Sequence, residues 1–287
     1  MDTRPSAVVV AVGGRGSSAA IEYAANEALR RHAALHLVHA LPEGDEGIDQ
    51  GTEILAAAVR LATALLDGLA PVTASLVPGR AVEVVAEAAG RADLVVVGRC
   101  AESQRTHPYV RSVTGGVGAR VEVPVVSVPD GWQPRVGPPT VVVGIDDPGE
   151  STDVLAAALR AAKERRARLV VVSTWWRPPV TKVSETGWQA VLEEGLDLAL
   201  DAVGARASGV PVEVQVRQAR PAETLIAASW NADLVVLGRH ATVVPAGSHL
   251  GPVARSVLRE SCCPVLLTTP RDPHLHEAAR RKLFIVS

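Results

Sequence analysis

The sequence has few aromatic residues and no long apolar run. Phe, Trp and Tyr make up 3% of its 287 residues while hydrophobic residues make up 47%, so its cores must be built mainly from Val, Ala and Leu. Such aliphatic cores suit parallel sheets that are covered on both faces. Apolar runs such as Leu94–Val97 are far shorter than the roughly 20 residues that a membrane-spanning helix needs.

Cysteine and net charge are also scarce. Cys100, Cys262 and Cys263 are odd in number and two of them are adjacent, which does not fit a disulfide framework. A formal net charge of −2 argues against non-specific attraction to nucleic acid or anionic lipid. The first residues, MDTRPSA, lack the apolar core of a signal peptide. We therefore expect a cytoplasmic protein whose partners are neither nucleic acids nor membranes.

The chain repeats itself. VVVAVGGRGSS at 8–18 is similar to VVVGIDDPGES at 141–151, and ADLVVVGR at 92–99 returns as ADLVVLGR at 232–239. Such self-similarity indicates two copies of one structural unit. We predict one domain over residues 1–129, a linker rich in Pro and Gly over 130–139, a second domain over 140–270 and a tail over 271–287.

Within each half, short aliphatic runs alternate with longer helical stretches. This pattern predicts right-handed crossovers and an open, five-stranded parallel sheet flanked by helices in each half. Ser17-Ser18 and Ser151-Thr152 are expected to cap the first helix of each half. The predicted strands are Ala7–Val12, Leu35–Ala40, Val72–Val77, Leu94–Gly98 and Val123–Val128 in the first half, and Val141–Asp146, Leu169–Thr174, Val212–Arg217, Leu234–Gly238 and Val265–Thr268 in the second.

Two further motifs stand at the ends of strands in the second half. The first strand ends in Gly144–Asp146, and the fourth leads into Gly238-x2-Ala241-x9-Gly251-Pro252, followed by a helix and an apolar strand that opens with Pro-Val. With the duplication and the strand order, these motifs resemble the universal stress protein family in its tandem two-domain form. The resemblance implies an α/β, Rossmann-like fold of the adenine nucleotide alpha-hydrolase type.

The resemblance also implies a ligand site. In nucleotide-binding members of the family, ATP lies in the crevice between the first and fourth strands, where the strand order reverses. The first strand's Asp and the end of the second strand face the base and ribose, and the glycine loop and the next helix hold the phosphates. Carried over to this chain, the site residues are Asp146, Thr174, Gly238, Arg239, Gly251 and Val253.

Several residues depart from the family pattern. Gly13 replaces the Asp in the first half, and Ala241 replaces the second loop glycine in the second half. Pro252 stands where the family has Ser or Thr, so a hydroxyl and a backbone N–H are missing from the phosphate cradle. We therefore expect at most one ATP site, with its Mg²⁺, in the second half.

Two functions stay open. One is a stress-response or signalling module that binds ATP or another adenine nucleotide. The alternative is an interaction or scaffold protein that binds no nucleotide and acts through dimerisation or partners. The last strands, VPVVSV and CPVLLT, could pair within one chain and so cover two sheet edges, and two chains could assemble further. No catalytic grouping or metal-ligand cluster is evident, so we expect no enzyme beyond very slow ATP hydrolysis.

Overall fold

A computed structural model of the chain describes residues 6–13, 17–41, 47–99, 113–175, 185–239 and 250–270. Ala241 and the tail over 271–287 lie outside these residues. The chain divides into two compact units between Pro134 and Arg135, and Cys262–Leu266 is grouped with the first unit. This division falls inside the expected linker, and the finer domain boundaries remain a prediction.

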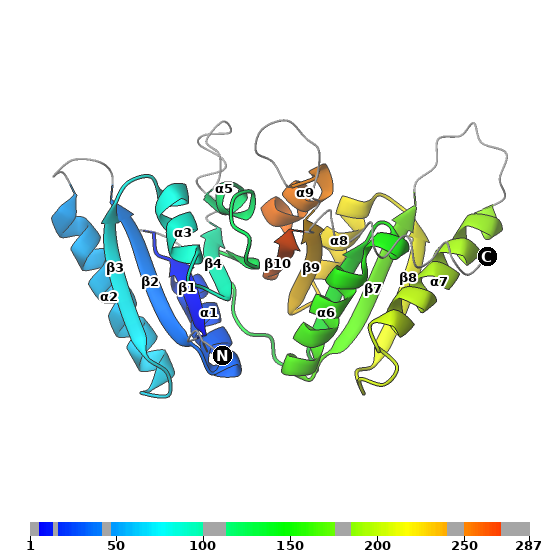
Figure 1. Cartoon of the computed structure of the whole chain (residues 1–287), viewed down its shortest axis with the longest axis horizontal. Coiled ribbons are helices and arrows are strands. Elements are labelled where there is room, and N and C mark those ends of the chain that lie inside the picture. The colour runs from blue at the N-terminus through cyan, green and yellow to red at the C-terminus, as the bar shows by residue number, and fades with distance from the viewer. Residues whose placement is uncertain are drawn as a thin grey trace. The chain divides into compact units, whose positions relative to one another are not determined.

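The first unit is built on a parallel sheet with the strand order β3-β2-β1-β4-β5 (Figure 1). Strand β1 pairs with β2 on one side and β4 on the other, and all four pairings within the unit are parallel. The elements are β1 (Ala7–Ala11), α1 (Ser17–Arg31), β2 (Ala34–Leu41), α2 (Ile48–Leu66), β3 (Val72–Pro78), α3 (Ala81–Ala89), β4 (Leu94–Arg99), α5 (Val113–Gly118) and β5 (Val125–Pro129).

The second unit repeats this plan with the strand order β8-β7-β6-β9-β10. Strand β6 pairs in parallel with β7 and β9, and β7 pairs in parallel with β8. The α/β fold with five strands in each half is therefore confirmed. The elements are β6 (Thr140–Ile145), η1 (Pro148–Glu150), α6 (Thr152–Arg165), β7 (Arg168–Trp175), α7 (Glu185–Ala202), β8 (Val212–Gln218), α8 (Pro221–Ser229), β9 (Leu234–Arg239), α9 (Pro252–Glu260) and β10 (Val265–Pro270).

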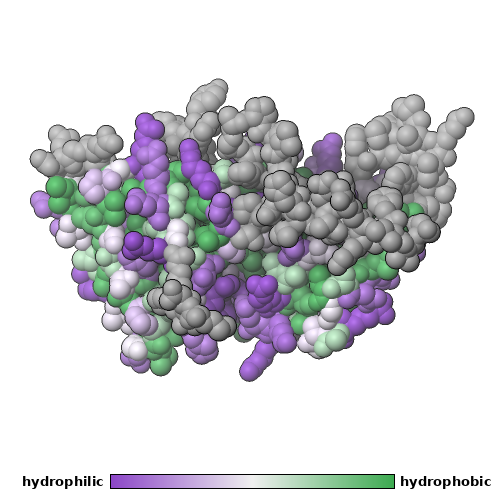
Figure 2. Space-filling view, viewed as in Figure 1, coloured by the Kyte–Doolittle hydropathy of each residue, from purple (hydrophilic) through white to green (hydrophobic). Residues whose placement is uncertain are grey.

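The central strands form the core of each unit. Val8–Val10 and Val141–Val143 are buried, because helices pack on the sheet from both faces. Polar and apolar side chains are interspersed on the visible surface (Figure 2). Of the helices that the structure describes, none has both the length and the apolar character needed to cross a membrane.

A serine hydroxyl closes the loop after the first strand in both units. Ser17 Oγ donates to the carbonyl of Gly13 at 2.9 Å, and Ser151 Oγ donates to the carbonyl of Asp147 at 2.5 Å. Ser151 stands at the N-cap position of α6, as expected, but its side chain makes no capping bond to the helix. Its hydroxyl is used instead to hold the loop that follows β6.

An aspartate joins the start of the first and fourth strands in both units. Asp93 Oδ2 accepts a hydrogen bond from Ala7 N at 3.2 Å, and Asp233 Oδ2 accepts one from Thr140 N at 2.7 Å. A second hydrogen bond joins the same two residues, because Asp233 N donates to Thr140 O at 2.8 Å. These bonds align β6 with β9, the strands whose other ends position the site.

We predict that Asp233→Ala lowers the free energy of unfolding by about 1–3 kcal/mol, because a hydrogen bond to a charged acceptor is lost at the half-buried start of β6. Equilibrium urea unfolding measures the change. Asp233→Asn keeps an acceptor oxygen and should lose less than half as much. An alanine variant as stable as the native protein would contradict the role assigned to Asp233.

Candidate functional site

A cavity of about 450 Å³ lies in the second unit at the carboxyl ends of β6, β7 and β9. Strand β6 lies between β7 and β9, and the chain leaves β6 and β9 toward different helices, α6 and α9. Open α/β sheets bind ligands where the strand order reverses in this way. The starts of α8 and α9 complete the wall, and the volume is at the lower end of the roughly 300–1,000 Å³ typical of small-molecule sites.

Five of the six residues expected from the sequence line this cavity: Asp146, Thr174, Gly238, Gly251 and Val253. Each stands at the end of a strand or the start of a helix. Asp146 directly follows β6, Thr174 lies near the end of β7, and Val253 is in the first turn of α9. Asp146 is exposed, so its carboxylate is open to a ligand or to water.

Arg239, the sixth expected residue, does not line the cavity. Its side chain is 1% exposed, and its Nε donates a hydrogen bond to the carbonyl of Thr268 on β10. Successive side chains along a strand point to opposite faces, so Gly238 and Arg239 cannot face the same space. Burial lowers the pKa of the Arg239 guanidinium to about 10. It stays charged at neutral pH, but its hydrogen bond to Thr268 is made with β10 and not with the cavity.

Strand alternation also separates Thr174 from Trp175. Thr174 lines the cavity, whereas Trp175 is not among the lining residues. The neighbouring Trp176 lies outside the described residues. In the part of the chain that the structure describes, the side chains of β6, β9 and α8 that line the cavity are mainly aliphatic.

Most of the cavity wall is apolar. Its polar side chains are Asp146, Ser151, Thr174 and Arg255. Pro252 also lines the cavity, and apolar residues that sequence reasoning had not singled out supply most of the remaining surface: Ile145, Val154, Val172, Pro221, Leu225, Leu237, Leu250 and Ala254. A wall of this kind, with a few polar groups at its edge, is typical of small-molecule sites.

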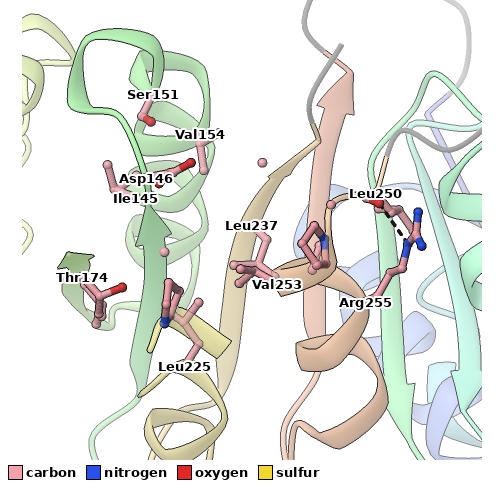
Figure 3. A pocket seen from close by; sticks show the side chains of 17 residues that line it. Ile145, Asp146, Ser151, Val154, Thr174, Leu225, Leu237, Leu250, Val253 and Arg255 are labelled. Atoms are coloured by element: carbon pink, nitrogen blue, oxygen red, sulfur yellow. Dashed lines mark hydrogen bonds between the residues drawn. The ribbon is translucent and has the colours of Figure 1, made fainter. Parts of the chain in front are cut away.

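Figure 3 shows Asp146 and Thr174 on the β6–β7 side, with Leu237 and Val253 facing them from β9 and α9. Arg255 and Leu250 lie together beyond the first turn of α9, where Arg255 Nε donates to the carbonyl of Leu250 at 3.0 Å. Leu250 is 4% exposed. This bond ties Leu250, two residues before the start of α9, to the fourth residue of that helix.

Two glycines keep the cavity open because no side chain would fit at their positions. A Cβ on Gly144 would lie 2.9 Å from Cδ1 of Leu225 and 3.0 Å from Cδ2 of Leu237. A Cβ on Gly238 would lie 2.8 Å from Cγ2 of Val154. Gly238 is therefore required for the packing of α6 against β9, independently of any ligand.

The start of α9 faces the cavity with few hydrogen-bond donors. Gly251 is the N-cap in an extended conformation, with φ −67° and ψ 169°, and Pro252 is the first helical residue. Arg255 N bonds to Gly251 O at 3.1 Å, as the first intrahelical bond requires. The N–H groups of Val253 and Ala254 lie in the first turn, where helical N–H groups have no partner within the helix.

Carboxylates and metal ligands are sparse at the cavity. Asp146 is the one acidic side chain among the lining residues that the structure describes. Over the described ranges, no three His, Cys, Asp or Glu residues come together as a metal site would require. A Mg²⁺ ion would therefore need ligands from a bound phosphate, with at most Asp146 added from this wall.

Comparison with known proteins adds to this geometry. A sequence model of the universal stress protein family matches residues 139–269. The universal stress protein Rv2005c of Mycobacterium tuberculosis is 31% identical over 282 residues, covering 91% of this chain and 96% of its own. The chain belongs to the universal stress protein family. It has the tandem form, since the alignment with Rv2005c runs through both halves.

Solved structures agree with the tandem form of this universal stress protein. A universal stress protein from Archaeoglobus fulgidus superposes with a TM-score of 0.70 at 19% identity, covering 93% of this chain and 97% of that one. A shorter universal stress protein, solved in complex with cAMP, matches 45% of this chain at 27% identity with a TM-score of 0.39.

We predict that Gly238→Ala in this universal stress protein lowers the free energy of unfolding by about 1–3 kcal/mol through overpacking against Val154. The same substitution in a Val154→Ala background should cost under about 0.5 kcal/mol, since the clashing methyl group is gone. Urea unfolding of the four proteins in this double-mutant cycle provides the test. Equal penalties in both backgrounds would show that Val154 does not constrain Gly238.

Proposed function

We propose that this tandem universal stress protein binds one adenine nucleotide in the cavity of its second unit and works as a stress-response or signalling module. The site consists of Asp146, Thr174, Gly238, Gly251 and Val253. The observation that carries the proposal is that these five residues, chosen from strand ends and loop glycines, line one cavity at the switch point of the sheet.

The chemistry of the wall supports an adenine nucleotide. The aliphatic side chains of Ile145, Leu225 and Leu237 suit the faces of a purine base. The Asp146 carboxylate is an acceptor for ribose hydroxyl groups. The first turn of α9 directs N–H groups and the positive end of its dipole toward an anion.

The equivalent position of the first unit lacks the main polar group of the site. Gly13, after β1, is the residue equivalent to Asp146, after β6. Gly13 N donates a hydrogen bond to Ser17 Oγ at 2.7 Å, and Ser17 Oγ donates one to Gly13 O at 2.9 Å. No side chain at this position can reach a ribose. We therefore place one site in the chain, in the second unit.

The alternative is an interaction or scaffold protein that uses the same fold without a nucleotide. The loss of two phosphate-binding groups at Pro252 favours this alternative. Pairing between the two last strands and assembly of two chains remain predictions that would serve either function.

Isothermal titration of the full chain with adenosine, AMP and ATP, each up to about 5 mM, distinguishes the two functions, because a specific small ligand gives measurable heat in this range. The proposal expects saturable heat from at least one adenine compound, and a thermal shift of the protein. If none of the three produced heat or a thermal shift, nucleotide binding would be refuted and the scaffold function would stand.

We predict that Asp146→Ala weakens the best adenine ligand by about 10- to 100-fold, the loss of one hydrogen bond to a charged group. Asp153→Ala is the matched control, because Asp153 is exposed on α6 of the same unit and does not line the cavity. Titration of both variants under identical conditions makes the comparison. Unchanged affinity in Asp146→Ala would remove Asp146 from the site.

A further inference from the structure

The phosphate end of the cavity is defined by the first turn of α9, and this turn is short of donors. A helix leaves its first four N–H groups, counted from the N-cap, without a partner in the helix, and these can bind an anion. Gly251 is the N-cap and Pro252, the next residue, has no N–H, so Gly251, Val253 and Ala254 supply three. Within the part of the chain that the structure describes, these three N–H groups are the backbone donors at the start of α9, and a triphosphate chain has more oxygens than they can satisfy.

Positive charge is equally limited there. Arg255 is the one cationic side chain among the described residues of the wall, and its Nε already donates to Leu250 O. Arg239 bonds to Thr268 O on β10. The sequence HATVVPAGSH over 240–249 contains no Lys or Arg. At neutral pH, ATP carries several negative charges, and Asp146 adds one more to the same cavity.

The rest of the wall fits the uncharged part of a nucleotide. Aliphatic side chains of β6, β9 and α8 surround a space of about 450 Å³. A purine base buried among them gains from the removal of apolar surface from water, at about 25 cal/mol per Å². The favourable contacts are therefore concentrated on the base and ribose, not on the phosphates.

We propose that the cavity selects adenine nucleosides with at most one phosphate, such as adenosine, AMP or a cyclic monophosphate, over ADP and ATP. This selectivity rests on the proposed function and assigns its ligand class. Pro252 is the residue that sets it, because it removes one N–H and one hydroxyl from the place where the second and third phosphates would need donors.

The test is a titration of the full chain with adenosine, AMP, ADP and ATP, the last two with and without Mg²⁺, at one ionic strength. AMP should bind at least about tenfold more tightly than ATP under either condition, the equivalent of one missing charged hydrogen bond. If ATP bound as tightly as AMP or more tightly, the selectivity would be wrong while nucleotide binding stood. If no adenine compound bound, the proposed function itself would fail.

Pro252→Ser supplies the missing N–H and hydroxyl together. It should raise the affinity for ATP by at least about tenfold, with the affinity for adenosine unchanged within about twofold. Pro252→Ala, which restores the N–H alone, should give a smaller gain. Pro211→Ser is the control, since Pro211 is an exposed proline of the same unit that does not line the cavity.

Thermal unfolding of each variant checks that the fold is retained. An unchanged ratio of ATP to AMP affinity in folded Pro252→Ser would show that Pro252 does not set the selectivity. A rise of the same size in Pro211→Ser would also overturn the assignment, because it would show that the effect does not depend on the first turn of α9.

Discussion

The parallel pairing of β6 with β9 is the constraint on which the site depends. The register pairs Val141 with Leu234, Val142 with Val235 and Val143 with Val236. The Asp233 carboxylate joins the starts of the two strands by accepting a hydrogen bond from Thr140 N. At the carboxyl ends of these strands, the chain leaves β6 toward α6 and leaves β9 toward α9. The space between these two strand ends stays open because Gly144 and Gly238 have no side chains to fill it. The cavity is thus a consequence of strand order and of two glycines required by packing.

The two units show how one scaffold can keep its fold while its site changes. Both begin with a buried aliphatic strand, both close the next loop with a serine hydroxyl, and both use an aspartate to align the first and fourth strands. These contacts serve folding, so they are present twice. The Asp146 carboxylate takes no part in these contacts, and the first unit has Gly13 at the equivalent position. The first unit therefore has the same fold without a carboxylate at this position.

Sequence reasoning predicted the fold well because aliphatic strands carry a strong local signal. The predicted strand Val141–Asp146 differs from β6 (Thr140–Ile145) by one residue at each end, whereas Val123–Val128 began two residues before β5 (Val125–Pro129). Proline and polar residues near a strand end do not reveal where the pairing stops. The repeat itself located the equivalent strands in both halves.

The site could be predicted only where its residues are tied to a strand end or a glycine. The positions of Asp146, Thr174 and Gly238 at the cavity could be predicted in this way. Arg239 was also expected at the site, but strand alternation turns its side chain toward Thr268 and it does not line the cavity. Leu225 and Arg255 come from α8 and α9, whose approach to the cavity is decided by tertiary packing. No short pattern in the sequence carries that information.

The most direct measurement is amide hydrogen exchange of the full chain with and without saturating AMP. The account predicts that added protection is confined to the second unit, at the ends of β6 and β9 and at the amides of Val253 and Ala254 in the first turn of α9, because a ligand bound there suppresses local opening. Protection at the ends of β1 and β4 in the first unit, with none at α9, would contradict it.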